Sequence, residues 1–315
     1  MTARTSASTL RGLAVRLALG SALVLVALFG GGAAEPGDGS VAGIPGGRLR
    51  GAREAVAVPA HPTLGFGRGV FGVSRQGALA RQHVRLPDFA TYDDVQRRRE
   101  DFFAWMLPLV DAENARLLDV RRRLTFVFEH MRWGRPLAVE DRRWLGELAV
   151  EFRIQDDPES PAFWRTAFER VDVLPDDLVV VQAANESAWG TSRFAREGNN
   201  LFGLWCFRPG CGLVPQDRPD GASYEVARFA NPAESVGSYM RNLNTGASYQ
   251  QLRQLRSAGR AVGRLPGAED LAEGLVDYSE RGEEYVHDIQ AMLRWNRPYI
   301  EAARASRILD VDGEG

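Results

Sequence analysis

One glutamate in this sequence stands where a carboxylate is unexpected. Glu186 lies near the end of an apolar segment, residues 174–190, that includes Val179, Val180 and Ala183. A helix that is apolar almost all round belongs inside a fold, where burial would raise the pKa of a carboxyl group toward the range of a general acid. Cleavage of a glycosidic bond needs such a proton donor. The alternative is a glutamate that braces a loop through backbone N–H groups, and the residue types alone leave both open.

The segments around Glu186 predict a mainly helical protein with a small β-lobe. Pro175 and two aspartates suit the first turn of the helix that carries Glu186, and Gly190 suits its end. Residues 224–229 alternate as in a strand. Asn231, followed by proline and by a glutamate three residues on, begins another helix. Apolar spacing predicts further helices within residues 91–153, 249–255, 269–275 and 283–295.

Changes in composition divide the chain into five parts. The N-terminal part is an export segment, and the next is rich in Gly, Ala and Pro without a regular period, as in a flexible spacer. We expect a signal peptide or membrane anchor at 1–34, a spacer at 35–90, a helical N-terminal region at 91–160, the functional domain at 161–300 and a C-terminal tail at 301–315.

The N-terminus carries the signature of export. Arg4, Arg11 and Arg16 precede an apolar run at residues 17–29, and small residues at 32–34 offer a cleavage site. The run is also nearly long enough to remain as an anchor in the inner membrane. Both alternatives place the rest of the chain outside the cytoplasm, in the periplasm or anchored facing it.

Two cysteines, Cys206 and Cys211, flank a turn that contains proline and glycine. In an oxidising compartment this spacing favours a local disulfide. A zinc site would need two further ligands, and no histidine lies near the pair in the sequence. We therefore expect a disulfide, with no metal and no organic cofactor. The formal net charge of -2 gives no global attraction to nucleic acid, so we expect none as a partner.

The run from Gln182 to Gly203, QAANESAWGTSRFAREGNNLFG, resembles the signature of the bacterial glucosaminidases of glycoside hydrolase family 73. The similarity continues through residues 224–229, 234–239 and 278–286. The residues of these later motifs are most similar to those of the exported Bax-type branch. The resemblance implies an α+β, mainly helical, lysozyme-like domain with a small β-lobe, preceded by a helical region. It also implies that Glu186 is the catalytic acid and that the substrate is the glycan strand of peptidoglycan. Most relatives have Gly where this chain has Ala188.

The resemblance also implies roles for several other residues. Glu225, 39 residues after Glu186, is the positional candidate for a second carboxylate, with Asp217 and Asp220 as competitors. Without one, the 2-acetamido group of the substrate could act as the nucleophile. Tyr278 matches a family tyrosine near the scissile sugar, where a catalytic role is implied: its hydroxyl could orient the acetamido group or support developing positive charge at the sugar ring. We expect the remaining site residues to form the wall or floor of a substrate cleft: Trp189, Asn200, Phe202 and Tyr285.

We expect an endo-β-N-acetylglucosaminidase that cuts peptidoglycan. A muramidase or a lytic transglycosylase is the nearest alternative, because lysozyme-like folds also cleave after N-acetylmuramic acid with a single glutamate. A non-catalytic peptidoglycan-binding scaffold is the alternative from another class. Its glycan binding would survive the loss of Glu186.

Overall fold

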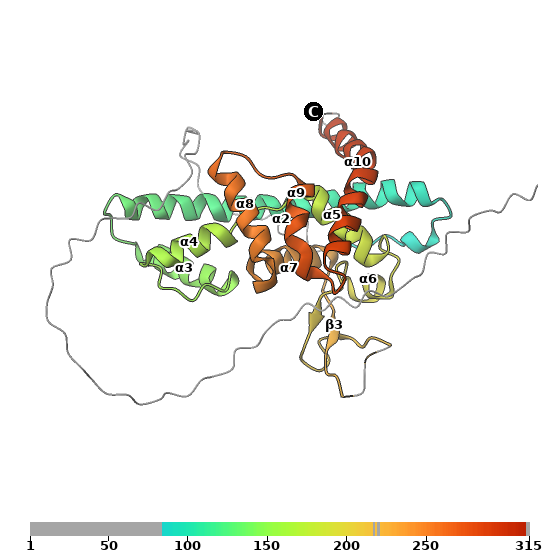
Figure 1. The fold of residues 1–315 in the computed structure, drawn as a ribbon, viewed down its shortest axis with the longest axis horizontal. Helices are drawn as coiled ribbons and strands as arrows, with labels where there is room; N and C mark the ends of the chain where they lie inside the picture. Colours follow the sequence, from blue (N-terminus) through green and yellow to red (C-terminus); the bar gives the residue numbers. More distant parts are fainter. Residues whose placement is uncertain (1–83, 217, 219–220, 313–315) are drawn as a thin grey trace, which may run out of the picture.

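The computed structural model describes residues 84–216, 218 and 221–312 and confirms a mainly helical α+β architecture (Figure 1). The predicted signal or anchor, and the spacer up to residue 83, lie outside the described residues. Three short strands pair antiparallel in the order β1-β3-β2 and form the β-lobe: β1 (Trp205–Cys206), β2 (Gly212–Leu213) and β3 (Glu225–Ala227). The helices are η1 (Phe89–Thr91), α2 (Val95–Arg132), α3 (Val139–Glu151), α4 (Pro161–Arg170), α5 (Asp176–Ser187), α6 (Arg193–Gly198), α7 (Pro232–Thr245), η2 (Ala247–Tyr249), α8 (Gln250–Ala261), α9 (Ala268–Ala272), η3 (Glu273–Tyr278) and α10 (Glu283–Asp312).

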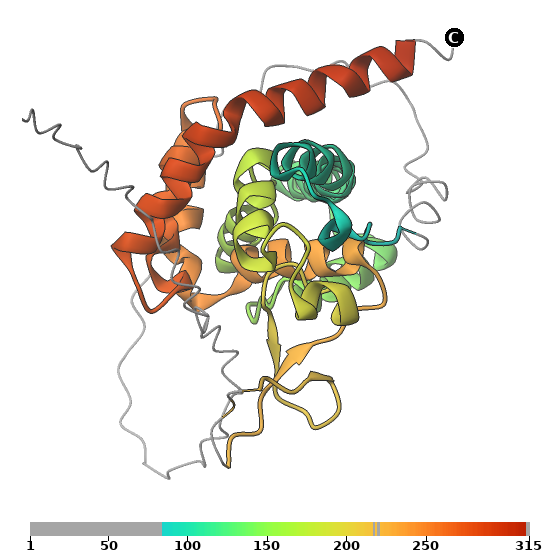
Figure 2. The ribbon, with the colours of Figure 1, turned by 90° about the vertical axis from the view of Figure 1, so that its right-hand side faces the viewer.

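The long helix α2 forms one side of the core, and several other helices pack on it. Asp94 caps it by accepting hydrogen bonds from the backbone N–H groups of Gln96 (2.8 Å) and Arg97 (3.2 Å). Helices α5, α7 and α10 all contact α2, and the β-lobe projects away from the helical body (Figures 1 and 2). One cluster of buried apolar side chains runs from α2 through α5 to α10. The predicted helical region and the predicted functional domain therefore share one core.

The packed part of the chain extends beyond both of the ends that the sequence suggested. Phe89, within the predicted spacer, is 1% exposed, because its ring packs against Phe102 and Trp105 at 5.4 and 5.8 Å between centroids. The predicted tail continues helix α10 to residue 312. Arg304 donates to Asp176 at 2.6 Å, which ties this last stretch to the first turn of α5.

A buried ion network joins the helices just before the first turn of α5. Asp172, which is 2% exposed, accepts two hydrogen bonds from Arg260, at 2.6 and 3.0 Å, and lies 3.6 Å from Arg121. Burial alone would raise the pKa of Asp172, but the Arg260 hydrogen bonds and the nearby arginine charges outweigh it and lower the pKa. The network holds α2 and α8 to the loop that leads into α5.

Within the described ranges, no helix combines the length and the apolar character needed to cross a membrane. The apolar run at 17–29, which we predicted as a signal or anchor, lies outside those ranges.

Candidate active site

Helix α5 ends abruptly, and this end positions Glu186. The Ser187 hydroxyl donates to the carbonyl of Ala183 (2.6 Å) and accepts from the N–H of Gly190 (2.8 Å). Ala188 has a φ of 50°, in the left-handed region, and therefore cannot continue the helix. The helix thus ends at Ser187, three residues before Gly190, which we had predicted as its stop. Glu186 falls in the last turn, where its side chain is half-buried.

Glu186 sits in an environment that suits a proton donor. Its Oε1 accepts hydrogen bonds from the Tyr285 hydroxyl (2.8 Å) and from the Asn185 amide (3.0 Å). Burial raises the pKa of Glu186 above the ordinary glutamate value, while these two hydrogen bonds partly oppose the shift. The net effect keeps the proton on this carboxyl to a higher pH than on an exposed glutamate.

Two buried residues that we had not predicted as functional continue the contacts of Glu186 inward. The Gln182 amide nitrogen donates to the Tyr285 hydroxyl oxygen at 2.9 Å, and the Tyr239 hydroxyl donates to the Gln182 amide oxygen. Gln182 lies one helical turn before Glu186, so the two side chains share one face of α5. An amide one turn before the glutamate, in an otherwise apolar helix, is the sequence signal that could have identified Gln182.

Tyr278 and Phe202 belong to the same aromatic cluster. The Tyr278 ring stacks on Tyr285 with centroids 5.2 Å apart, and its hydroxyl donates to the carbonyl of Phe202 at 3.1 Å. The Phe202 ring stacks on Tyr239 at 3.9 Å. Tyr278 and Phe202 are both 0% exposed. Their contacts are thus with the tyrosines behind Glu186, and direct contact of either with a sugar stays a prediction.

Two other predicted substrate-binding residues make their contacts elsewhere. The Asn200 side chain donates to the carbonyls of Leu204 and Ala227, both at 2.8 Å, and accepts from the N–H of Leu204 at 3.0 Å. These bonds stabilise the loop that leads into the β-lobe. Trp189 packs its ring on Phe103 of α2, with centroids 5.3 Å apart. The structure thus brings Glu186 together with the tyrosine cluster but gives Asn200 and Trp189 separate neighbours.

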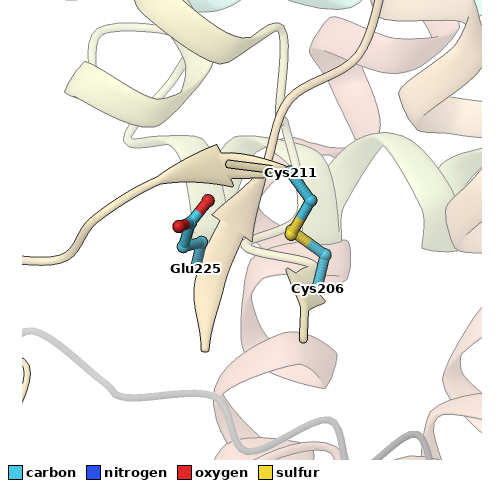
Figure 3. Close-up of side chains that lie close together, drawn as sticks. All are labelled: Cys206, Cys211 and Glu225. Atoms are coloured by element: carbon cyan, nitrogen blue, oxygen red, sulfur yellow. A yellow bond between two sulfur atoms is a disulfide. The ribbon is translucent and has the colours of Figure 1, made fainter. Parts of the chain in front are cut away.

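The β-lobe carries the predicted disulfide and Glu225 (Figure 3). Cys206 and Cys211 are bonded, with their Cα atoms 6.2 Å apart, as we had expected. Glu225 accepts hydrogen bonds from the N–H groups of Gly210 (2.9 Å) and Gly212 (2.7 Å). These bonds lower its pKa, so the carboxylate stays ionised. The competing candidates at 217 and 220 lie outside the described residues.

The same three side chains have the spacing of a metal site, because the cysteine sulfurs and a Glu225 oxygen lie within 4.8 Å of one another. Metal ligation by cysteine requires the thiolate. Both sulfurs are bonded in the disulfide, so the oxidised lobe offers one carboxylate at this place. The cluster is therefore a structural brace of the lobe in its oxidised form.

Comparison with known proteins agrees with this arrangement. Residues 162–296 match the glucosaminidase family, described as mannosyl-glycoprotein endo-beta-N-acetylglucosaminidase. Over 218 residues the chain is 30% identical to "Protein bax" of Escherichia coli (strain K12), a match that covers 69% of this chain and 76% of that protein. No solved structure matches. The helical body with its three-stranded lobe agrees with a lysozyme-like glucosaminidase domain. The chain therefore belongs to the glucosaminidases of glycoside hydrolase family 73, on the Bax-type branch.

Proposed function

We propose that this glycosidase is an endo-β-N-acetylglucosaminidase of peptidoglycan and that Glu186 is its general acid. One observation carries the proposal: within the family's domain, burial at the end of α5 raises the pKa of Glu186. A raised pKa lets a carboxyl group hold its proton to a higher pH than an exposed glutamate does and deliver that proton to the leaving oxygen of a glycosidic bond. The bond that we assign is the β-1,4 linkage after N-acetylglucosamine.

The second half of the reaction requires a nucleophile or a base. Glu225 is ionised, as a base must be, but its hydrogen bonds to Gly210 and Gly212 hold it within the β-lobe. The 2-acetamido group of the substrate is the other candidate, and it needs no second carboxylate as nucleophile. The Tyr278 hydroxyl donates to the Phe202 carbonyl, so we assign Tyr278 a supporting role: its ring stacks on Tyr285, the tyrosine that contacts Glu186.

The proposed substrate implies that the enzyme acts outside the cytoplasm. Peptidoglycan lies beyond the inner membrane, and the arginines and apolar run at the N-terminus are typical of an export segment. We infer a periplasmic enzyme that is either released by cleavage near residue 34 or retained by residues 17–29 as an anchor. N-terminal sequencing of the exported protein distinguishes the two forms.

Digestion of purified sacculi, followed by mass spectrometry of the fragments, tests both activity and bond choice. New reducing-end N-acetylglucosamine is the expected product. Reducing or 1,6-anhydro-muramic ends would instead identify a muramidase or a lytic transglycosylase. If the intact protein binds sacculi without creating new ends, it is a scaffold.

A further inference from the structure

Glu186 is approached from the protein interior by a chain of hydrogen bonds that runs in one direction. The Tyr239 hydroxyl donates to Oε1 of Gln182, and Nε2 of Gln182 donates to the Tyr285 hydroxyl oxygen at 2.9 Å. The Tyr285 hydroxyl then donates to Oε1 of Glu186 at 2.8 Å. The three residues behind Glu186 are at most 2% exposed. Because an amide has an acceptor at one end and donors at the other, each group fixes the orientation of the next.

We propose that Tyr239 and Gln182 are positioning residues that aim the Tyr285 hydroxyl at Oε1 of Glu186, so that the transferable proton is carried on Oε2. The proposal rests on the function of Glu186 proposed above. Asn185 also donates to Oε1, at 3.0 Å, so two donors meet the same oxygen. An oxygen that accepts two hydrogen bonds is a poor site for a proton, which the neutral acid therefore carries on its other oxygen.

In the cleavage step, the bond between Oε2 and its proton breaks and the proton passes to the glycosidic oxygen. The electrons of the broken C–O bond stay with that leaving oxygen, and the anomeric carbon gains a new electron pair from the 2-acetamido oxygen or from water that a base has deprotonated. The electrons of the O–H bond return to Glu186. The ionised carboxylate then keeps its two donors at Oε1, which stabilise the charge that it has gained. The same donor-to-acceptor order, from Tyr239 through Gln182 and Tyr285 to Glu186, therefore suits both the protonated and the ionised form of the acid.

The direction of the chain depends on its innermost member. When the Tyr239 hydroxyl is removed, Oε1 of Gln182 loses its donor and the amide is free to turn by half a rotation. Gln182 would then present an acceptor to Tyr285, and the Tyr285 proton would turn away from Glu186. Tyr239→Phe tests this with the loss of a single oxygen, because the phenylalanine ring can keep the stacking contact with Phe202.

The test measures the pH dependence of kcat for the full exported chain on soluble glycan strands released from sacculi by an amidase. We expect Tyr239→Phe to lower kcat about tenfold with KM unchanged, a loss of orientation rather than of binding. The alkaline limb of the profile should move to higher pH, because the ionised form of Glu186 has lost a donor. Gln182→Met should act in the same direction. The double variant should be no worse than Gln182→Met, since both changes interrupt one chain.

The matched control is Tyr249→Phe, which removes the hydroxyl of another buried tyrosine. Tyr249 is 2% exposed, and its ring lies 6.2 Å from that of Tyr278, but its hydroxyl makes no hydrogen bond to Tyr239, Gln182, Tyr285 or Glu186, all of which the structure describes. We expect Tyr249→Phe to keep the wild-type profile. A carbon-13 NMR titration measures the pKa of the Glu186 carboxyl without any turnover of substrate. The signal is assigned by its loss in Glu186→Gln.

The two proposals fail in different ways. An unchanged NMR titration and an unchanged pH profile in folded Tyr239→Phe would overturn the positioning role, while an inactive Glu186→Gln would leave the acid in place. Conversely, near-wild-type cleavage by folded Glu186→Gln would overturn the acid, whereas the titration would still report whether Tyr239 orients Tyr285.

Discussion

The end of helix α5 and the β-lobe each hold a glutamate, and they treat it in opposite ways. At the end of α5, burial raises the pKa of Glu186, and two side-chain donors only partly oppose this. In the lobe, backbone N–H groups of Gly210 and Gly212 lower the pKa of Glu225. One carboxyl group is thus prepared to hold a proton and the other to remain an anion.

The difference teaches that burial and the source of the hydrogen-bond donors together decide which form of a carboxyl group is favoured. The Glu225 donors are Gly210, inside the turn that the disulfide closes, and Gly212, directly after it, so the charge of Glu225 stabilises local structure. The Glu186 donors are side chains, Tyr285 from α10 and Asn185 from α5 itself, and both leave Oε2 outside their contacts. Pairs of carboxyl groups whose pKa values are pushed apart are a common basis for acid and base roles. The experiments below separate the catalytic contribution of each site from its structural contribution.

The largest expected effect is on catalysis at the end of α5. We expect Glu186→Gln to lower the rate of fragment release from sacculi by roughly two to four orders of magnitude, because the amide has no acidic proton to donate to the leaving oxygen. Since a buried carboxyl with a raised pKa costs stability when it ionises, the variant should melt no lower than wild type at neutral pH. Circular dichroism measures folding, and mass spectrometry measures release.

For the contrast between the two glutamates to hold, Glu186→Gln must lower the rate of fragment release without lowering the melting temperature. The variant should also still sediment with sacculi. If folded Glu186→Gln released fragments at nearly the wild-type rate, Glu186 would return to the structural role that its residue type alone left open.

The disulfide should give the next largest effect, and that effect should be confined to the lobe. We expect Cys206→Ser/Cys211→Ser to lose about 2 kcal/mol of unfolding free energy, the value from loop-closure entropy for so short a ring. Wild type treated with a reductant should show the same loss, and the double variant should not respond to the reductant. Because the bond contacts none of the groups around Glu186 that the structure describes, the alkaline limb of the pH profile should stay in place. A shift of the alkaline limb in the double variant would show instead that the β-lobe and the surroundings of Glu186 are coupled.

Glu225→Gln should produce a smaller loss of stability together with a partial loss of activity. An amide in place of the carboxylate can turn an N–H group toward Gly210 or Gly212, where an acceptor is needed. We expect the melting temperature at pH 7 to fall by about 3 °C. Turnover should fall less than in Glu186→Gln, because the acid is intact.

The pH dependence of the Glu225 effect follows from its lowered pKa. A carboxylate whose pKa is lower in the folded state stabilises the protein above the ordinary glutamate pKa, and this stabilisation is lost as the pH falls through the folded-state value. The difference in melting temperature between wild type and Glu225→Gln should therefore narrow in acid. A turnover loss as large as that of Glu186→Gln, in folded protein, would instead assign Glu225 to the chemistry.

Local signals in the sequence predicted most of the fold but only part of the site. Asn231 caps α7 as its residue type indicated, and the cysteine spacing predicted the disulfide. The chain of hydrogen bonds behind Glu186 was not predictable in this way, because Gln182 and Tyr285 are 103 residues apart and meet only when α10 packs on α5. The end of α5 was misplaced because the turn uses a left-handed alanine, a conformation for which residue type gives no signal.

That alanine gives the smallest expected effect. Ala188 has φ 50° and ψ 51°, a conformation in which its Cβ crowds the backbone and which glycine adopts freely. Glycine also gives the unfolded chain more freedom, which offsets part of the gain. We expect Ala188→Gly to stabilise the protein by about 0.5 kcal/mol, or roughly 1–2 °C in melting temperature, with turnover unchanged. Ala302→Gly is the matched control, because Ala302 is exposed within α10, where glycine should cost up to about 1 kcal/mol. If both variants melted lower than wild type, the left-handed turn would not be the strained feature that separates the end of α5 from an ordinary helix.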